Sequence, residues 1–120
     1  MTNQKQALGR WGEDTAIRFL QQNDYTILER NVRSLRGEID IVAFKDGAVI
    51  FVEVKTRSSI AFGFPEDAVT HRKQASMLQA AENYFLNHPD CPDTWQFDIL
   101  AITLKTGSHP VIEHFENVLG

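Results

Sequence analysis

Residues 37–57, GEIDIVAFKDGAVIFVEVKTR, constrain the fold more than any other part of the chain, because they have the pattern of a β-hairpin. Two runs rich in apolar and β-branched residues flank Asp46-Gly47, a dipeptide that favours a two-residue turn. This turn pairs Lys45 with Ala48 and thereby fixes the register of the pairs beyond it. Both faces of the hairpin are then largely apolar, which predicts that other parts of the protein cover both.

Charged side chains gather at the end of this hairpin that lies away from the turn. The register places Asp40 opposite Glu53 and Glu38 opposite Lys55, all on one face whose inner half is apolar. Opposed Cβ atoms are about 4.5–5.5 Å apart, so the carboxylates of Asp40 and Glu53 would repel each other. The opposite face is expected to carry Ile39, Ile41, Ala43, Ile50, Val52 and Val54.

Two interpretations of this charged end stay open. A divalent cation would turn the repulsion into attraction, because hard cations such as Mg²⁺ bind carboxylate oxygens. A solvated face held by salt bridges is the structural alternative, but it leaves the wholly apolar inner half of the same face unexplained. The pattern therefore favours a functional site.

The whole chain of 120 residues predicts a single α/β domain, residues 1–120, with a mixed central sheet flanked by helices. The element order is α-β-β-β-α-β-β. In the second helix, Met77, Leu78 and Tyr84 are predicted to be core residues, and Pro89 ends the helix. The expected helices are residues 4–22 and 70–86, and the expected strands are 25–32, 39–44, 48–56, 95–104 and 111–115.

Composition and charge limit the class of function. The net charge of −4 argues against nucleic acid, yet residues 30–73 hold eight of the 12 Lys and Arg residues. A locally basic groove is compatible with an acidic protein. The single cysteine, Cys91, excludes a disulfide framework and predicts a reducing cytoplasm. No apolar run approaches the roughly 20 residues that span a bilayer, so no membrane partner is expected.

Asp40 followed by Glu53-Val54-Lys55 across a hairpin resembles the D…(D/E)-x-K signature of the restriction-endonuclease-like nucleases. Glu13, in the segment GRWGEDTA, is similar to the glutamate that archaeal Holliday-junction resolvases carry in their first helix. With GEIDIVA, FVEVKTR and the helix opening near residue 73, the chain resembles the YraN family over nearly its full length. That family consists of small bacterial proteins of unproven function that are usually grouped with those resolvases.

The resemblance implies a restriction-endonuclease-like domain that hydrolyses phosphodiester bonds with Mg²⁺ or Mn²⁺. Asp40 and Glu53 would be metal ligands, with the Val54 carbonyl as the third. Lys55 would position the attacking water or stabilise charge on the phosphate. Glu13 would bind the metal directly or through water. In metal-assisted hydrolysis the ion supplies the nucleophile and neutralises charge, so few residues are needed.

The first predicted helix gives Glu13 a rival and two unusual neighbours. Asp14 is also acidic, but it points roughly 100° away from Glu13 around the helix. Gly9 and Gly12 each cost about 1 kcal/mol relative to alanine in a helix. Close approach of the helix to the sheet or to substrate would explain both glycines, and an irregular helix start is the alternative.

Three basic residues, Arg36, Arg57 and Lys73, are candidates for phosphate contacts, although solvated surface charges are the alternative for each. DNA is favoured over RNA as the partner, and the DNA substrates considered include branched or otherwise structured DNA. The competing hypotheses are a module that binds nucleic acid or a partner without turnover, and an interaction domain that holds a structural ion. A homodimer is compatible with resolvase-like proteins, but no patch identifies an interface.

The remaining polar candidates are Asp98, Glu38 and the four histidines, and none of them is predicted to be catalytic. Asp98 interrupts an apolar strand, where it would mark an edge or satisfy a backbone group. Glu38 is either an outer acid of the site or a partner for Lys55. The four histidines lack metal-ligand spacing and are predicted to be non-catalytic.

Overall fold

The protein folds into one five-stranded mixed sheet with two helices, in the predicted order α-β-β-β-α-β-β. The computed structural model describes residues 4–35, 37–58, 70–104, 107 and 109–119. The elements are α1 (Gln4–Gln22), β1 (Thr26–Ser34), β2 (Gly37–Lys45), β3 (Ala48–Arg57), α2 (His71–Asn87), β4 (Trp95–Thr103) and β5 (Val111–Phe115).

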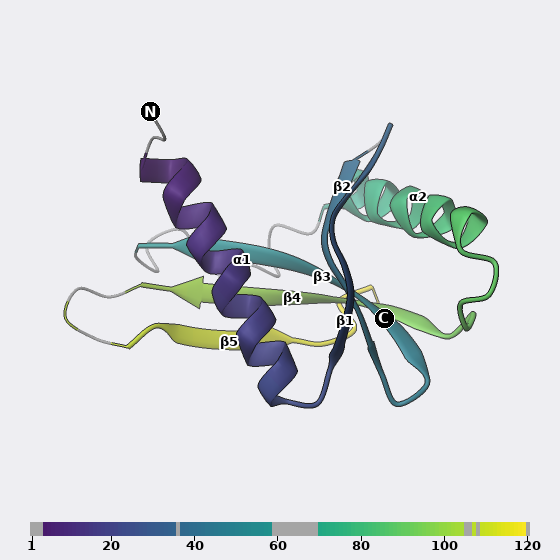
Figure 1. Ribbon diagram of the computed structural model, residues 1–120. Helices are drawn as coiled ribbons and strands as arrows, with labels where there is room; N and C mark the ends of the chain where they lie inside the picture. The colour runs from purple at the N-terminus through teal and green to yellow at the C-terminus, as the bar shows by residue number, and fades with distance from the viewer. Residues whose placement is uncertain (1–3, 36, 59–69, 105–106, 108, 120) are drawn as a thin grey trace.

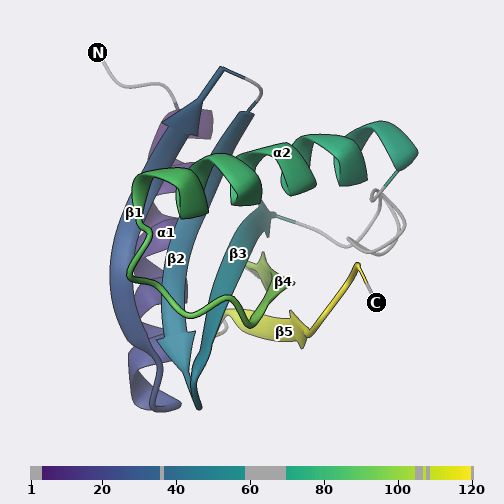
Figure 2. The same ribbon diagram turned by 90° about the vertical axis from the view of Figure 1, so that its right-hand side faces the viewer.

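The strands lie in the sheet in sequence order, β1-β2-β3-β4-β5. Among the strands of the described residues, only the β3–β4 pair is parallel, and α2 forms the crossover between these two strands, as a parallel connection requires. The other three pairs are antiparallel. Two views of the ribbon show α1 and α2 on opposite faces of the sheet (Figures 1 and 2).

Each face of the sheet has its own apolar core, which confirms that both faces of the hairpin are covered. On the α1 side, Ala16 and Leu20 of the helix are fully buried against the sheet. On the α2 side, the Phe51 ring contacts the rings of Tyr84 and Phe97. The buried sheet residues of the first core are Ile41, Ala43, Ile50, Val52, Leu100 and Ile102, and those of the second are Ile39, Val42, Val49, Phe51 and Phe97.

Helix α2 begins with a threonine cap, because the Thr70 side chain accepts a hydrogen bond from the Lys73 backbone N–H at 3.2 Å. Its buried residues are Met77, Ala80, Ala81 and Tyr84. The prediction that Leu78 is a core residue is wrong, since its side chain is 44% exposed. Leu78 lies about 100° around the helix from Met77, which turns it towards solvent.

The hairpin register is confirmed over the five pairs nearest the turn, from Lys45–Ala48 to Ile41–Val52. Asp46 and Gly47 have φ values of 51° and 82°, the left-handed conformation that a type I′ turn requires at both positions. The predicted pairing of Asp40 with Glu53 is wrong, because the β2–β3 ladder in the described residues stops at Ile41–Val52.

The ladder stops because β2 and β3 separate towards their outer ends, a divergence that is visible in Figure 2. The outer end of β2 stays paired with β1 through Val32–Ile39 and Arg33–Glu38. The outer end of β3 stays paired with β4 as far as Arg57. Each strand therefore follows its other partner, and a gap opens between them.

Ile39 does not share the face of Ile41, as the simple alternation of side chains predicted. Ile39 packs in the α2-side core, whereas Ile41 packs in the α1-side core. In the neighbouring strand, Asn31 has a φ of 55°, outside the β region. We attribute the change of face to twisting of the β1–β2 pair at this position, which turns its outer end towards α2.

Candidate metal centre

Asp40 lies at the point where β2 and β3 separate, and its side chain replaces a backbone partner there. Asp40 Oδ2 accepts a 2.8 Å hydrogen bond from the Val54 backbone N–H. A strand residue directs its N–H and its C=O towards the same neighbouring strand. The Val54 carbonyl, the predicted third metal ligand, therefore also faces the gap that contains Asp40.

The Asp40 carboxyl group is destabilised in its charged form. The pKa of Asp40 is raised from 3.8 to about 6, chiefly by burial, although the hydrogen bond from Val54 opposes this shift. Negative charge on Glu13, Glu53 and Glu38 contributes to the increase. Four carboxyl groups from α1, β2 and β3 thus interact electrostatically around a partly buried position.

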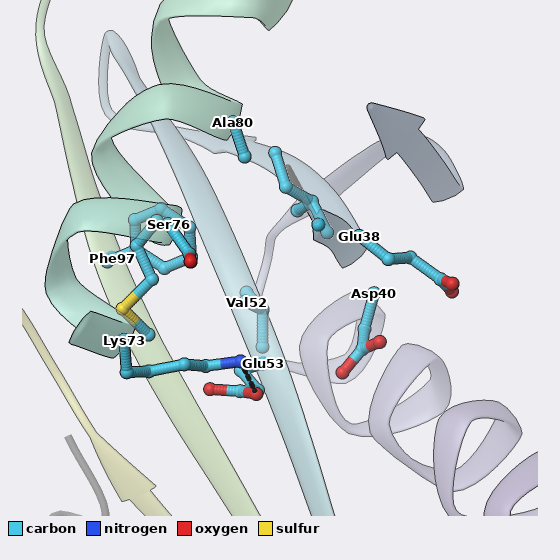
Figure 3. A pocket seen from close by; sticks show the side chains of 11 residues that line it. Glu38, Asp40, Val52, Glu53, Lys73, Ser76, Ala80 and Phe97 are labelled. Atoms are coloured by element: carbon cyan, nitrogen blue, oxygen red, sulfur yellow. Dashed lines mark ion pairs between the residues drawn. The ribbon is translucent and has the colours of Figure 1, made fainter. Parts of the chain in front are cut away.

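Glu53 is the carboxylate that two lysines neutralise. Its Oε1 lies 2.8 Å from Lys73 Nζ and 3.5 Å from Lys55 Nζ, and its side chain is only 16% exposed. Figure 3 shows Lys73 reaching from α2 to Glu53, and both residues line a cavity of about 120 Å³. The same cavity is bordered by Asp40, and its inner wall is apolar, formed by Ile39, Val52, Met77, Ala80 and Phe97.

Glu13 reaches the site from α1, as predicted. It borders a groove between α1 and β3 that is also lined by Asp40, Val54 and Lys55. Its side chain is 21% exposed and lies 3.6 Å from the guanidinium of Arg30. Asp40 lines both this groove and the cavity beside Glu53, so the predicted metal-site residues lie around two adjoining hollows.

The rival acid, Asp14, points away from the groove. Its side chain is 53% exposed and accepts a 3.0 Å hydrogen bond from Arg30. Arg30 therefore holds both neighbouring acids of α1, with Glu13 on the side of the groove. The sequence alone gives little sign of this contact, because Arg30 lies in a different element.

Asn31 is a residue of the site that the sequence patterns missed. In the orientation that satisfies its amide, the nitrogen donates 3.0 Å hydrogen bonds to Glu13 Oε1 and to Glu38 Oε1. Its φ of 55° is one that asparagine tolerates better than most residues. An asparagine within a strand pattern is the one signal that could have drawn attention to this position.

The two glycines of α1 have different surroundings. A Cβ atom at Gly12 would collide with the Thr56 side chain, so α1 and β3 approach each other closely at this residue. A Cβ atom at Gly9 would meet nothing within 4 Å, and Gly9 borders the groove beside Glu13. Close approach to the sheet explains Gly12 but not Gly9.

The other candidates lie around this region with less direct roles. Arg57 is at the end of β3 and is partly exposed, while Arg36 lies outside the described residues. Glu38 forms a 3.8 Å ion pair with Arg33 rather than the alternative pair with Lys55. Contact of Arg57 with phosphate stays a prediction.

The donors around Asp40 are of the kind that Mg²⁺ or Mn²⁺ binds, although the carboxylate oxygens of Glu13, Asp40 and Glu53 do not all lie within 4.8 Å of one another. The carboxylates of Asp40, Glu53 and Glu13 and the carbonyl of Val54 offer oxygen ligands only, which hard divalent cations prefer. A cation would also relieve the repulsion that raises the pKa of Asp40. The residues present therefore fit such an ion.

A second polar cluster lies around Asp98, which is fully buried in β4. Asp98 accepts hydrogen bonds from His114 Nε2 at 2.7 Å, from Gln96 Nε2 at 2.9 Å and from the Asn117 backbone N–H at 2.9 Å. Both carboxylate oxygens are thus engaged within the protein. The exposed Glu116 is also close enough to share a cation with Asp98 and His114. The contacts fit the structural role predicted for Asp98, which includes satisfying a backbone group.

Comparison with known sequences identifies the family of this chain. The sequence model of the family described as "Uncharacterised protein family UPF0102" matches residues 12–102, which include Glu13, Asp40, Glu53 and Lys55. The chain belongs to the UPF0102 family. UPF0102 is the YraN family, so the predicted resemblance is confirmed.

Full-length relatives support this assignment. The chain is 47% identical to a UPF0102 protein of Trichlorobacter lovleyi, covering 93% of this chain and 89% of the relative. It is 43% identical to one from Syntrophotalea carbinolica, with coverage of 96% and 93%. A UPF0102 protein of Desulforamulus reducens is 38% identical, with coverage of 99% and 100%.

Across the residues that the structure describes, neither helix combines the length and the apolar character needed to cross a membrane.

Proposed function

We propose that this protein is a nuclease that hydrolyses phosphodiester bonds in DNA, including branched or structured DNA, with Mg²⁺ or Mn²⁺. One observation carries the proposal: Asp40, whose pKa is raised to about 6, lies among Glu13, Glu38 and Glu53 at the gap between β2 and β3. A sheet held together only by packing gains nothing from such a cluster.

Asp40 and Glu53 are the proposed ligands, together with the Val54 carbonyl and, directly or through water, Glu13. When bound, the ion would neutralise these carboxylates, activate the attacking water and stabilise negative charge on the phosphate. The Val54 N–H holds Asp40 in place through its hydrogen bond. Asn31 and Arg30 do the same for Glu13.

Lys55 supplies positive charge beside the proposed ligands. Its ammonium group lies 3.5 Å from Glu53 and borders the groove that contains Glu13 and Asp40. We assign it the role of orienting the attacking water or stabilising the charge that develops on the phosphate. Lys55 would thus act as a cation beside the acidic cluster, in addition to Lys73.

The remaining parts of the proposal concern partner and compartment. DNA is favoured over RNA, and Arg36, Arg57 and Lys73 are the proposed phosphate contacts. They belong to residues 30–73, which hold eight of the 12 Lys and Arg residues. We propose a cytoplasmic protein, because Cys91 has no second cysteine in the chain with which to form a disulfide.

A second candidate is a module that binds nucleic acid or a partner through the same groove without cleaving it. Its support is that Lys55 and Lys73 both form ion pairs with Glu53. These ion pairs would stabilise the charged cluster as a structural feature that needs no catalytic role.

A cleavage screen separates the two candidates. Labelled linear, nicked, flapped and four-way DNA substrates would be incubated with wild type and Glu53→Gln, in Mg²⁺, in Mn²⁺ and in EDTA. Glu113→Gln is the matched control, because Glu113 is an exposed acid on β5. The nuclease requires metal-dependent cleavage that Glu53→Gln loses and Glu113→Gln keeps. Binding without cleavage in any metal would favour the second candidate.

A further inference from the structure

We propose that Lys73 is a positioning residue. It forms an ion pair with Glu53 while no divalent cation is bound, and it contacts a substrate phosphate once the cation has displaced it from Glu53. This inference rests on the proposed function, since it concerns the same metal site. It assigns Lys73 a role that couples binding of the metal to binding of nucleic acid.

The contact between Lys73 and Glu53 is the shortest ion pair of the site. Lys73 Nζ lies 2.8 Å from Glu53 Oε1, compared with 3.5 Å for Lys55 Nζ and the same oxygen. The Glu53 side chain is 16% exposed, so this contact is less screened than an ordinary surface pair. Glu53 is therefore held by an ammonium group at one of the two oxygens that could bind a metal shared with Asp40.

A divalent cation and Lys73 cannot both keep this position. A cation bound through Glu53 Oε1 would stand within a few ångströms of the ammonium group, and the two positive charges would repel each other. Lys55 lies on the same strand as Glu53, two residues along, and already borders the adjacent groove. Lys73 comes from a separate element, so it is the cation that gives way.

The local structure lets Lys73 move without disturbing the helix. Its backbone N–H is fixed by the Thr70 cap, and its side chain is 39% exposed at the rim of the cavity. The four-carbon stem of lysine can redirect its ammonium group by rotation alone. A phosphate held at the metal would lie within the reach of that group.

Coupling follows from this exchange. If the metal frees Lys73 for a phosphate, then metal binding raises the affinity for DNA, and DNA raises the affinity for metal by the same factor. Removal of Lys73 should strengthen metal binding, because the competing charge is gone. Removal of Lys73 should also reduce the factor by which metal raises the affinity for DNA.

Calorimetric titration with Mn²⁺ tests the competition without relying on catalysis. We expect Lys73→Met to bind Mn²⁺ about tenfold more tightly than wild type, within the usual range of coupling between sites. Lys73→Arg, which keeps the charge, should stay close to wild type. Arg72→Met is the matched control, because Arg72 is an exposed cation at the neighbouring position of α2, and its Mn²⁺ affinity should change by less than about twofold.

Binding of labelled duplex DNA with and without Ca²⁺ tests the coupling. The gain in affinity on adding Ca²⁺ should be several-fold larger for wild type than for Lys73→Met. An equal gain, or Mn²⁺ affinity equal in wild type and Lys73→Met, would overturn the role of Lys73. Failure of both proteins to bind Mn²⁺ would instead overturn the proposed function. Thermal melts of Lys73→Met and Lys73→Arg establish that the variants are folded.

Discussion

The Asp40 carboxylate accepts a 2.8 Å hydrogen bond from the Val54 N–H at the place where strands β2 and β3 stop pairing. The side chain thereby satisfies a backbone donor that the lost ladder would leave without its strand partner. One oxygen of Asp40 serves this bond, and the other remains as a potential metal ligand. Asp40 therefore combines a structural role with the proposed role as a metal ligand.

Replacing Asp40 with asparagine should separate these two roles in the metal-free protein. The amide oxygen can still accept from Val54, whereas the destabilised charge is gone. Since the pKa of Asp40 is about 6 when folded and 3.8 in its ordinary state, the native protein holds more protons between these values. The free energy of unfolding of wild type should therefore fall, relative to Asp40→Asn, by up to about 3 kcal/mol as pH rises from 4 to 7.

Urea denaturation of both proteins in EDTA at pH 4, 5.5 and 7 measures this difference. If wild type instead gains stability relative to Asp40→Asn as pH rises, then Asp40 is stabilised in its charged form by a favourable ion pair.

The two glycines of α1 provide a matched pair for the packing of this helix. Gly12→Ala should destabilise the protein by about 1–3 kcal/mol, because its Cβ would collide with Thr56 and force α1 away from β3. Gly9→Ala should be neutral or stabilising by up to about 1 kcal/mol, since its Cβ meets nothing. Chemical denaturation of both variants gives the comparison, and equal effects would contradict the close approach at Gly12.

Much of this architecture follows from local sequence patterns, and the limits of those patterns are physical. The Asp46-Gly47 turn fixes the five nearest hairpin pairs, because register near a tight turn is a local property. The opposition of Asp40 and Glu53 was not predictable in the same way. Whether strands stay paired far from the turn depends on β1 and β4, which are distant in sequence.

In the candidate site, too, local sequence patterns predicted some features and missed those that depend on distant elements. Glu13, Asp40, Glu53 and Lys55 were identified from motif spacing, and the structure brings them to adjoining grooves. The hydrogen bonds of Asn31 and the ion pair between Lys73 and Glu53 were missed. Both contacts join separate elements, so neither spacing nor periodicity carries a signal for them.

The buried cluster around Asp98 should matter for stability. Asp98→Ala would leave the Asn117 N–H and His114 without their acceptor, which should cost about 2–4 kcal/mol in the free energy of unfolding. Asp93→Ala is the control, because Asp93 is exposed and should change stability by less than about 0.5 kcal/mol. Guanidinium denaturation measures both. A small effect for Asp98→Ala would show that the cluster contributes little.

The proposed phosphate contact at Arg57 predicts a change in salt dependence. Arg57→Glu should weaken DNA binding and reduce the slope of log affinity against log salt by about one, because each phosphate contact releases about one counterion. Arg18→Glu on α1 serves as control, since Arg18 borders a different groove beside Pro110 and Ile112. Fluorescence anisotropy across a salt series provides the slopes. An unchanged slope for Arg57→Glu would place the DNA-binding surface elsewhere.

The response of wild type and Asp40→Asn to Mn²⁺ in thermal melts tests the metal site most directly. A ligand that binds only the folded protein raises its melting temperature. We expect wild type to melt several degrees higher in Mn²⁺ than in EDTA, and Asp40→Asn to melt at least as high as wild type in EDTA but to gain nothing from Mn²⁺. If Asp40→Asn is instead less stable than wild type in EDTA and gains as much from Mn²⁺, then Asp40 does not bind metal and the proposed site is wrong.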